Sequence, residues 1–366
     1  MKVGIPKEIK NNEFRVGLTP DKVNIIVSNG HEVFVQKDAG SAIGYSDTQY
    51  LNAGAKVVDT LADVYKNADL ILKVKEPQPE ELAMIKEGQV IFSYLHLAAE
   101  KELTEELIRR KAIAIAFETL TDDFGKLPLL KPMSAVAGRV AIQAACFALQ
   151  KNNAGNGLLI GGVENIKPCN VLILGGGVVG ENAAFVASGM GANVEVLEKF
   201  DNRIAELSKL YPNRFKVKPF SDELLRTLLV DADVVVGAIL LPGKSAPKIL
   251  SREHIRLMPK NSVFVDVAID QGGCSDTSRP TTHSEPTYIE EDVIHYCVTN
   301  MPAVAAKTAT LALEEATFPY LLQLVNSDIE ELCKTNVNFR NGLNVYYDKL
   351  VNKSVADSLG LEYSDI

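Results

Sequence analysis

A glycine-rich turn after a short apolar run constrains the fold of this 366-residue chain more than any other feature. The segment VLILGGGVVGENAA places Gly175, Gly177 and Gly180 in the spacing G-x-G-x-x-G, after a β-type run and before a helical pattern. The first glycine permits a tight turn, the second lets the backbone approach a pyrophosphate, and the third lets the helix pack closely on the strand. The helix N-terminus offers free N–H groups to the phosphates. The segment therefore predicts a Rossmann-type dinucleotide site.

An acidic residue at the expected distance indicates which dinucleotide is bound. Glu198 ends the next β-type run, 23 residues after Gly175 (198 − 175 = 23). A carboxylate there accepts hydrogen bonds from a ribose 2′-OH and repels a 2′-phosphate, so NAD is favoured over NADP. Arg203 is the counter-argument, because an arginine can accommodate that phosphate. FAD shares the fingerprint, but no other sequence feature points to it.

Short β-type runs alternate with helical patterns along the chain, which predicts α/β architecture with parallel sheets. Strands are expected at Lys2–Ile5, Glu32–Gln36, Leu70–Val74, Val90–Phe92, Ile113–Phe117, Val171–Leu174, Asn193–Leu197, Val234–Gly237, Val263–Val267 and His295–Val298. Helices are expected from Pro20 to Asn29, at Lys101–Arg110, from Ser134 to about Gln150, and from Ala303 to about Val325. The segment Thr121–Pro132 is interpreted as a linker, and Leu332–Ile366 as helical.

Charge and cysteine usage narrow the class of protein. The net charge of −9 argues against a nucleic-acid or anionic-membrane partner. The chain has no apolar run of about 18 residues and no signal-peptide pattern, so we expect neither a membrane span nor export. Its five cysteines are scattered and form no C-x-x-C pair, which disfavours a disulfide framework or a zinc site. A cytoplasmic protein is the resulting expectation.

Three polar residues follow strands in the first third of the chain. Arg15 follows the first strand, Lys75 ends the run LILKVKEP, and His96 follows VIFSYL. Open α/β sheets place ligands at the carboxyl ends of their strands. Arginine and lysine suit a small carboxylate, and histidine can move a proton near neutral pH. An isolated arginine or lysine is more often a solvated surface charge, and an isolated histidine is more often structural.

Asp270, in FVDVAIDQGGC, is a fourth candidate at a strand end. We expect Asp270 to face the cleft, while Asp266 caps or turns the chain. The alternative for either residue is a simple Asx-type turn.

These motifs together resemble the alanine dehydrogenases. The resemblance extends from MKVGIPKEIKNNEFRVGLTP through LKVKEP, SYLHLAA, ILGGGVVGENAA and GAILLPG to VDVAIDQGGCSDTSRPTTH and VTNMPA. It implies two doubly wound domains, with a central Rossmann NAD-binding domain (131–303) inserted in a discontinuous substrate domain (1–130 and 304–366). It also implies a homohexamer, and a chemistry that requires no metal.

The resemblance also implies roles for individual residues. Arg15 and Lys75 match substrate-binding positions, and His96 and Asp270 match the proton-handling pair. The matching cofactor contacts are Ser134, Gly175, Gly177, Val178, Val179, Gly180, Glu198, Arg203, Ile239, Leu240, Ala268, Ile269, Asp270, Val298, Asn300 and Met301.

The implied activity is the reversible oxidation of L-alanine by NAD to pyruvate, ammonium and NADH. The main alternative is the NAD-binding subunit of a proton-translocating transhydrogenase, which performs no chemistry on a small substrate. A dehydrogenase for a bulkier amino acid and an inactive NAD-sensing module are further alternatives. His96 and Lys75 favour the dehydrogenase over the transhydrogenase subunit.

Overall fold

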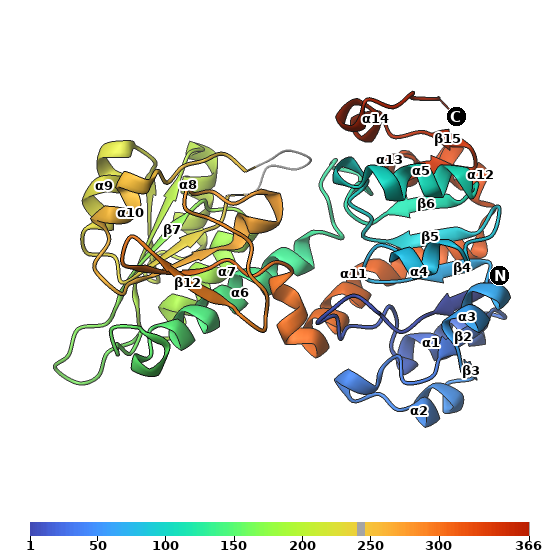
Figure 1. Cartoon of the computed structure of the whole chain (residues 1–366), viewed down its shortest axis with the longest axis horizontal. Helices are drawn as coiled ribbons and strands as arrows, with labels where there is room; N and C mark the ends of the chain where they lie inside the picture. The colour runs from blue at the N-terminus through green and yellow to red at the C-terminus, as the bar shows by residue number, and fades with distance from the viewer. Residues whose placement is uncertain (240–245, 366) are drawn as a thin grey trace. The chain divides into compact units, whose positions relative to one another are not determined.

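The structure is a computed structural model and describes residues 1–239 and 246–365 (Figure 1). The chain divides into two compact units, one formed by Met1–Met133 with Ala305–Ile366 and the other by Ser134–Val304. Each unit contains its own sheet, largely parallel, so the prediction of α/β fold class is confirmed. Among the described helices, none has the length and apolar character needed to cross a membrane.

The first unit is built on a sheet in the order β15-β14-β6-β5-β4-β1-β2-β3. Its strands are β1 (Lys2–Ile5), β2 (Glu32–Gln36), β3 (Lys56–Val58), β4 (Leu70–Leu72), β5 (Val90–Ser93), β6 (Ile113–Ala116), β14 (Leu343–Tyr346) and β15 (Lys349–Leu350). Strands β1 to β6 pair in parallel, whereas β14 pairs antiparallel with β6 and β15 antiparallel with β14. Figure 1 shows β15 beyond β6, on the side away from β5.

Helices flank this sheet and bury its apolar strands. They are α1 (Pro20–Ser28), α2 (Asp47–Asn52), α3 (Leu61–Asn67), α4 (Pro79–Leu82), α5 (Lys101–Arg109), α11 (Ala306–Asn326), α12 (Ile329–Thr335), α13 (Val337–Gly342) and α14 (Lys353–Leu359). Ile71, Ile91 and Ala114 of the central strands are completely buried in one cluster that also contains Val345 of the returning tail. The chain's C-terminal segment is therefore part of the first unit's core.

The second unit has a sheet in the order β12-β13-β11-β10-β7-β8-β9. Its strands are β7 (Asn170–Leu174), β8 (Asn193–Glu198), β9 (Lys216–Pro219), β10 (Val234–Gly237), β11 (Val263–Asp266), β12 (Thr287–Glu290) and β13 (Val293–Tyr296), and its helices are α7 (Val178–Gly189), α8 (Asp201–Leu210), α9 (Asp222–Leu229) and α10 (Arg252–Leu257). Helix α6 (Lys131–Ala148) begins in the first unit and continues into the second. Among the described strands of this sheet, β12 alone pairs antiparallel, at the edge.

Both sheets share one order of parallel strands. When only its parallel strands are numbered along the chain, from β7 as the first to β13 as the sixth, the sheet of the second unit has the order third-second-first-fourth-fifth-sixth. This is the Rossmann order, and strands β1 to β6 of the first unit have the same order. The order reverses between β1 and β4 in one unit, and between β7 and β10 in the other. Ligands of such sheets bind where the order reverses, at the carboxyl ends of the strands.

Some expected elements differ from those observed. Helix α6 begins at Lys131 rather than Ser134, because Pro132 lies in the first turn, where its missing N–H costs nothing. The tail after Leu332, expected to be helical, contains β14 and β15 as well as helices. The last parallel strand, β13, begins at Val293, two residues before the expected His295.

Candidate active site

The first unit gathers charged side chains where its strand order reverses. The segment after β1 contributes Glu8, Glu13 and Arg15, and the segment after β4 contributes Lys73 and Lys75. All are at most 9% exposed. Buried charges occur in proteins almost only when they are paired. A concentration of them at a ligand-binding edge therefore points to a binding site rather than to a packing core.

Arg15 is held by a carboxylate two residues before it. Its Nε and Nη2 donate to the two oxygens of Glu13 at 2.7 and 2.6 Å, and its Nη1 lies 3.1 Å from the sulfur of Met133. Burial opposes the charge on Arg15, but Glu13 outweighs it and raises the guanidinium pKa. The guanidinium is therefore a fixed cation with its Nε–Nη2 edge against Glu13.

Lys75 is held through both its side chain and its backbone. The ammonium lies 3.4 Å from one carboxylate oxygen of Glu76, and the other oxygen of Glu76 pairs with Lys10. Burial works against the Glu76 charge, yet Lys75 and Lys10 together hold the pKa of Glu76 at about 2. The Lys75 amide N–H points to Glu8, with a nitrogen–oxygen distance of 3.4 Å. A substrate carboxylate would share this cation with Glu76.

His96 is exposed and lies in a strained turn after β5. Its φ of 53° is in the left-handed region, which residues other than glycine seldom adopt. Its backbone N–H donates to Glu118 at 2.5 Å, and its ring lies 6.0 Å from the stacked ring of Tyr94. Strain of this kind persists where surrounding contacts over-determine it, often at functional sites.

Tyr94 connects His96 to Arg15. The phenol is buried, donates to the carbonyl of Leu129 at 2.5 Å and lies close enough to Arg15 for their charges to interact. Burial raises the pKa of Tyr94, so the phenol stays protonated at neutral pH. The three residues predicted from the sequence therefore lie at the same edge of one sheet, two of them linked through this ring.

The sequence interpretation missed a buried charge cluster beside Lys75. The Lys73 ammonium is fully buried, 2.7 Å from Glu81 of α4 and 3.2 Å from Glu8. Tyr65 of α3 also donates to Glu81, at 3.1 Å. Glu8 lies in a polar stretch that is typical of an exposed loop, whereas Lys73 lies inside the expected strand Leu70–Val74, and its pairing with two carboxylates is not visible in the sequence. The only available signal was that each lies within three residues of a strand end.

In the second unit, the glycine loop after β7 has the geometry that a dinucleotide needs. Gly175 has a φ of 97°, and a Cβ on Gly180 would lie 1.9 Å from the Gly175 carbonyl oxygen, so both positions require glycine. A Cβ on Gly177 would meet no atom within 4 Å. Space is thus open above Gly177, at the N-terminus of α7, where a phosphate can approach the backbone.

Glu198 supports this loop as well as facing it. One carboxylate oxygen accepts from the Gly176 N–H at 2.7 Å, and the other accepts from Lys199 and Phe200 at 2.7 and 3.0 Å. Arg203 donates to the Gly176 carbonyl and pairs with Glu181. The structure thus shows a loop-supporting function for Glu198 that sequence spacing alone did not indicate.

Asp266 and Asp270, separated by one turn, differ in environment. Asp266 is completely buried and accepts hydrogen bonds from the backbone N–H groups of Ala268 and Cys274 and from the Ser278 hydroxyl. Asp270 is exposed and accepts from the Asn300 N–H at 3.1 Å. Asp266 therefore stabilises the turn, and Asp270 remains available to a ligand.

The other predicted cofactor contacts lie in the second unit. Ile239 packs near Gly175, with its Cγ1 3.2 Å from an ideal Gly175 Cβ. Leu240 lies outside the described residues. Val179, Ala268, Ile269, Val298 and Met301 are buried, whereas Ser134 on α6 and Val178 at the start of α7 are half-buried.

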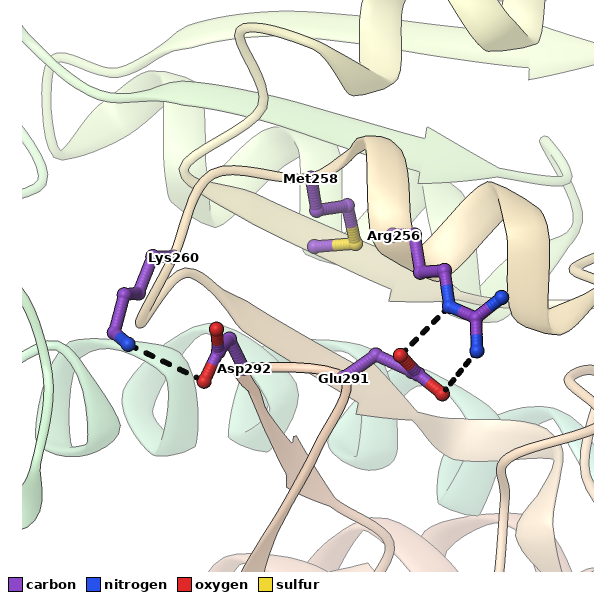
Figure 2. Close-up of a pocket in the computed structure, with 5 residues that line it drawn as sticks. All are labelled: Arg256, Met258, Lys260, Glu291 and Asp292. Carbon is purple, nitrogen blue, oxygen red and sulfur yellow. Dashed lines mark hydrogen bonds and ion pairs between the residues drawn. The ribbon is translucent and has the colours of Figure 1, made fainter.

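A separate hollow in the second unit is a poor candidate for the cofactor. It is lined by Arg256, Met258, Lys260, Glu291 and Asp292 (Figure 2). Arg256 pairs with Glu291, and Lys260 pairs with Asp292. These residues precede β11 and β13, so the hollow lies at the edge of the sheet opposite the glycine loop. Its charges neutralise one another, and it has no glycine-lined approach for a phosphate.

Comparisons with known proteins identify the family of this chain. The model of the alanine dehydrogenase/PNT N-terminal domain matches residues 4–137, and that of the C-terminal domain matches residues 141–353. The chain belongs to the alanine dehydrogenase/PNT family. Membership implies a dinucleotide cofactor and small-molecule substrates, and the glycine loop described above fits such a cofactor.

Individual relatives cover nearly the whole chain. It is 47% identical to an alanine dehydrogenase of Halomonas elongata, over 99% of this chain and 98% of that protein. It is 44% identical to alanine dehydrogenase 2 of Staphylococcus aureus, over 100% and 98%. Among solved structures, an L-alanine dehydrogenase matches with a TM-score of 0.95 at 42% identity, covering 98% of this chain and 99% of that one. A Sinorhizobium meliloti transhydrogenase, at 22% identity and a TM-score of 0.84, shares the fold.

Proposed function

We propose that this protein catalyses the reversible NAD-dependent oxidative deamination of L-alanine to pyruvate, ammonium and NADH. The observation that carries the proposal is the set of Arg15, Lys75 and His96 at one sheet edge of the first unit, within a family whose relatives are alanine dehydrogenases. Two buried cations beside an exposed imidazole suit a small amino acid or oxo acid.

The first unit would bind the substrate. Arg15 and Lys75 clamp the carboxylate of alanine or pyruvate, with Glu13 and Glu76 orienting the two cations. The clamp contributes mainly orientation, which is a large term when a cofactor carries the difficult chemistry. The Tyr94 ring, packed on His96, holds the imidazole beside this clamp.

The second unit would bind NAD. The N–H groups at the start of α7 hold the pyrophosphate above Gly177, and Glu198 accepts from the ribose 2′-OH as well as supporting the loop. Ile239 and the buried residues near Ala268 and Val298 line the rest of the site. The Glu198 carboxylate would repel the 2′-phosphate of NADP, which supports NAD as the cofactor.

The chemistry divides between the cofactor and the protein's own residues. NAD, held by the glycine loop and Glu198, would supply the acceptor for a hydride from the alanine Cα. Arg15 and Lys75 hold the substrate so that the neutral amine drives this step. His96 accepts a proton as water adds to the substrate iminium, and it returns that proton as ammonia leaves. Asp270 orients the attacking water or the departing ammonia.

A direct assay tests the proposal. Purified protein is mixed with NAD and L-alanine at alkaline pH, and absorbance of NADH is followed. The proposal expects NADH with alanine and, in the reverse direction, NADH consumption with pyruvate and ammonium. Retained NADH binding without turnover would point instead to a transhydrogenase-type subunit or a sensor. Activity only with larger amino acids would select a different dehydrogenase.

A variant tests the role of His96. His96→Ala should lower turnover by roughly 10²-fold or more while leaving NADH affinity unchanged, because the imidazole acts in proton transfer and not in cofactor binding. His31, a half-buried histidine elsewhere in the same unit, supplies the matched control as His31→Ala.

The division of labour and the assembly state are part of the same proposal. We infer that the first unit is the substrate domain, that the second is the NAD domain, and that six chains assemble in the cytoplasm. All five cysteines are free thiols, which agrees with a reducing compartment. Sedimentation analysis of the purified protein tests the hexamer.

A further inference from the structure

The chain that continues from β4 to Lys75 is no longer paired with β1, one of the two neighbouring strands of β4. Strand β1 last pairs with β4 at Ile71, whereas on the other side the Lys73 N–H still bonds to Phe92 and the Val74 carbonyl to Tyr94. The chain carrying Lys75 is therefore supported by the sheet on one side only. Something else must satisfy the backbone N–H groups on the other side.

Beyond the end of this pairing, the Glu8 side chain accepts the hydrogen bonds that β1 no longer accepts. Its side chain is 1% exposed, and its Oε1 accepts from the Val74 N–H at 2.7 Å and, more weakly, from the Lys75 N–H at 3.4 Å. A single carboxylate oxygen thus takes over the pairing that a strand would provide. The position of the Lys75 backbone therefore depends on Glu8.

Glu8 is fixed in turn by the buried cluster behind it. Lys73 lies 3.2 Å from Glu8 Oε2 and is shared with Glu81, at 2.7 and 3.0 Å from its two oxygens. Glu81 also accepts from the backbone N–H of Gln78, which ties the cluster to α4. The two lysines after β4 therefore have different surroundings: Lys73 is fully buried between Glu8 and Glu81, and Lys75 pairs with Glu76.

We propose that Glu8 is a positioning residue for Lys75, which holds the chain leaving β4 so that the Lys75 ammonium meets the substrate carboxylate. The inference rests on the proposed function, because it assumes that Lys75 binds the substrate. The negative charge of Glu8 is not required for this positioning, since the two backbone N–H groups need only an acceptor oxygen. Burial, above all, raises the pKa of Glu8, which agrees with a role for the oxygen rather than for the charge.

Substitutions at Glu8 separate these requirements. Glu8→Gln keeps the acceptor oxygen, Glu8→Asp shortens the arm by one methylene, and Glu8→Ala removes it. The matched control is Glu314→Ala, because Glu314 is also a buried carboxylate of the first unit that accepts from a backbone N–H and a hydroxyl, both of Thr19. The control loses a comparable buried group without touching the chain at Lys75.

The readouts on the full-length enzyme are KM for alanine and pyruvate, kcat, the NADH dissociation constant and the melting temperature. Glu8→Ala should raise both KM values about 10-fold or more, since small misplacements of a binding group are costly. Glu8→Gln should stay within about threefold of wild type, because its amide oxygen still accepts. NADH affinity should not change in any variant, and Glu314→Ala should lower the melting temperature but not raise KM.

Other outcomes overturn the inference. KM values for Glu8→Ala that match those of Glu314→Ala would show that Glu8 is only structural. A Glu8→Gln variant as impaired as Glu8→Ala would show that charge, and not the acceptor oxygen, matters. If Glu8→Ala does not fold, Glu8→Asp should have the higher KM of the remaining pair, and the reverse order contradicts the proposal.

Lys75→Ala separates this inference from the proposed function. If Lys75→Ala raises KM and Glu8→Ala does not, the inference fails and the proposed function stands. If Lys75→Ala has normal KM values for alanine and pyruvate, the substrate site is wrongly assigned and both proposals fail.

Discussion

The two units arrange their parallel strands in the same order, β6-β5-β4-β1-β2-β3 in one and β13-β11-β10-β7-β8-β9 in the other. At the reversal point of the first unit, the proposed binding groups are the buried side chains of Arg15, which Glu13 holds, and Lys75, whose backbone Glu8 supports. At the same point of the second unit it comes from the main chain around Gly177, and Glu198 supports that loop.

This difference indicates that one strand order can support the binding of two kinds of ligand. A small carboxylate needs cations held in fixed positions, and the first unit supplies them by burying paired charges. A pyrophosphate needs bare N–H groups, and the second unit supplies them by removing side chains. Substitutions should therefore act differently in the two units: deleting a charge should harm substrate binding, and adding a methyl group should harm cofactor binding.

The largest expected effect is in the first unit. Lys75→Ala should lower kcat/KM for alanine by roughly 10²- to 10³-fold, because a preorganised charge is lost from the site. The NADH dissociation constant should stay within about twofold of wild type, since the glycine loop is untouched. Lys66→Ala, which removes an exposed lysine of α3, is the control for loss of charge alone. Comparable losses in both variants would contradict the assignment.

A methyl group at the tightest glycine should act on the second unit. Gly180→Ala places a Cβ 1.9 Å from the Gly175 carbonyl oxygen, so the start of α7 must move away from β7. We expect a loss of about 1–3 kcal/mol in stability, together with weaker NADH binding. The control is Gly189→Ala at the other end of α7, where the new Cβ comes no closer than 3.9 Å to its neighbours. Thermal unfolding with and without NADH measures both effects, and equal behaviour of the two variants would count against the close packing described.

In the proposed cofactor site, we expect Glu198 to discriminate NAD from NADP. Glu198→Gln should reduce the preference for NAD over NADP about 10-fold, because the neutral amide no longer repels a 2′-phosphate. Glu195→Gln, on the same strand but paired with Lys218, is the control. The measurement is kcat/KM for each cofactor. An unchanged preference would leave Glu198 with its loop-supporting role alone.

The smallest expected effect is on the pH dependence of stability. Lys75 and Lys10 hold the pKa of Glu76 at about 2, below its ordinary value of 4.5. A carboxyl with a lowered pKa stabilises the fold above pH 4.5, and this contribution is lost as the pH falls towards 2. Glu76→Gln should therefore be less stable by about 1–2 kcal/mol near neutral pH, with the gap closing in acid. Urea unfolding at several pH values tests this, with the exposed Glu80→Gln as control, and a gap independent of pH would be evidence against the pairing.

The sequence predicted the central strands well because their apolar runs are strong. Lys2–Ile5, Glu32–Gln36 and Val234–Gly237 have the expected bounds. The strands that were missed lie at or near sheet edges, where pairing rather than composition decides the structure. Residues 216–219, with sequence KVKP, end in proline and form β9, and residues 343–346, with sequence LNVY, form β14 only because β6 is available as a partner.

The site was predictable where chemistry leaves a pattern in the sequence and not where packing decides. Gly175, Gly177 and Gly180 follow from local spacing alone. The buried state of Glu8 could not be predicted, because its neighbours Lys7 and Lys10 make the segment look solvated. The left-handed backbone of His96 likewise depends on Glu118, which is distant in the sequence.

The most direct test of the contrast between the two units is NADH binding by Gly177→Ala, followed by fluorescence titration. The position has ordinary extended backbone and open space around its Cβ, so alanine should not change the melting temperature. We expect an NADH dissociation constant about 10-fold higher, because the methyl group keeps the pyrophosphate from the backbone. The KM for pyruvate at saturating NADH should not change. An unaltered dissociation constant would contradict the claim that the main chain of this loop binds the cofactor.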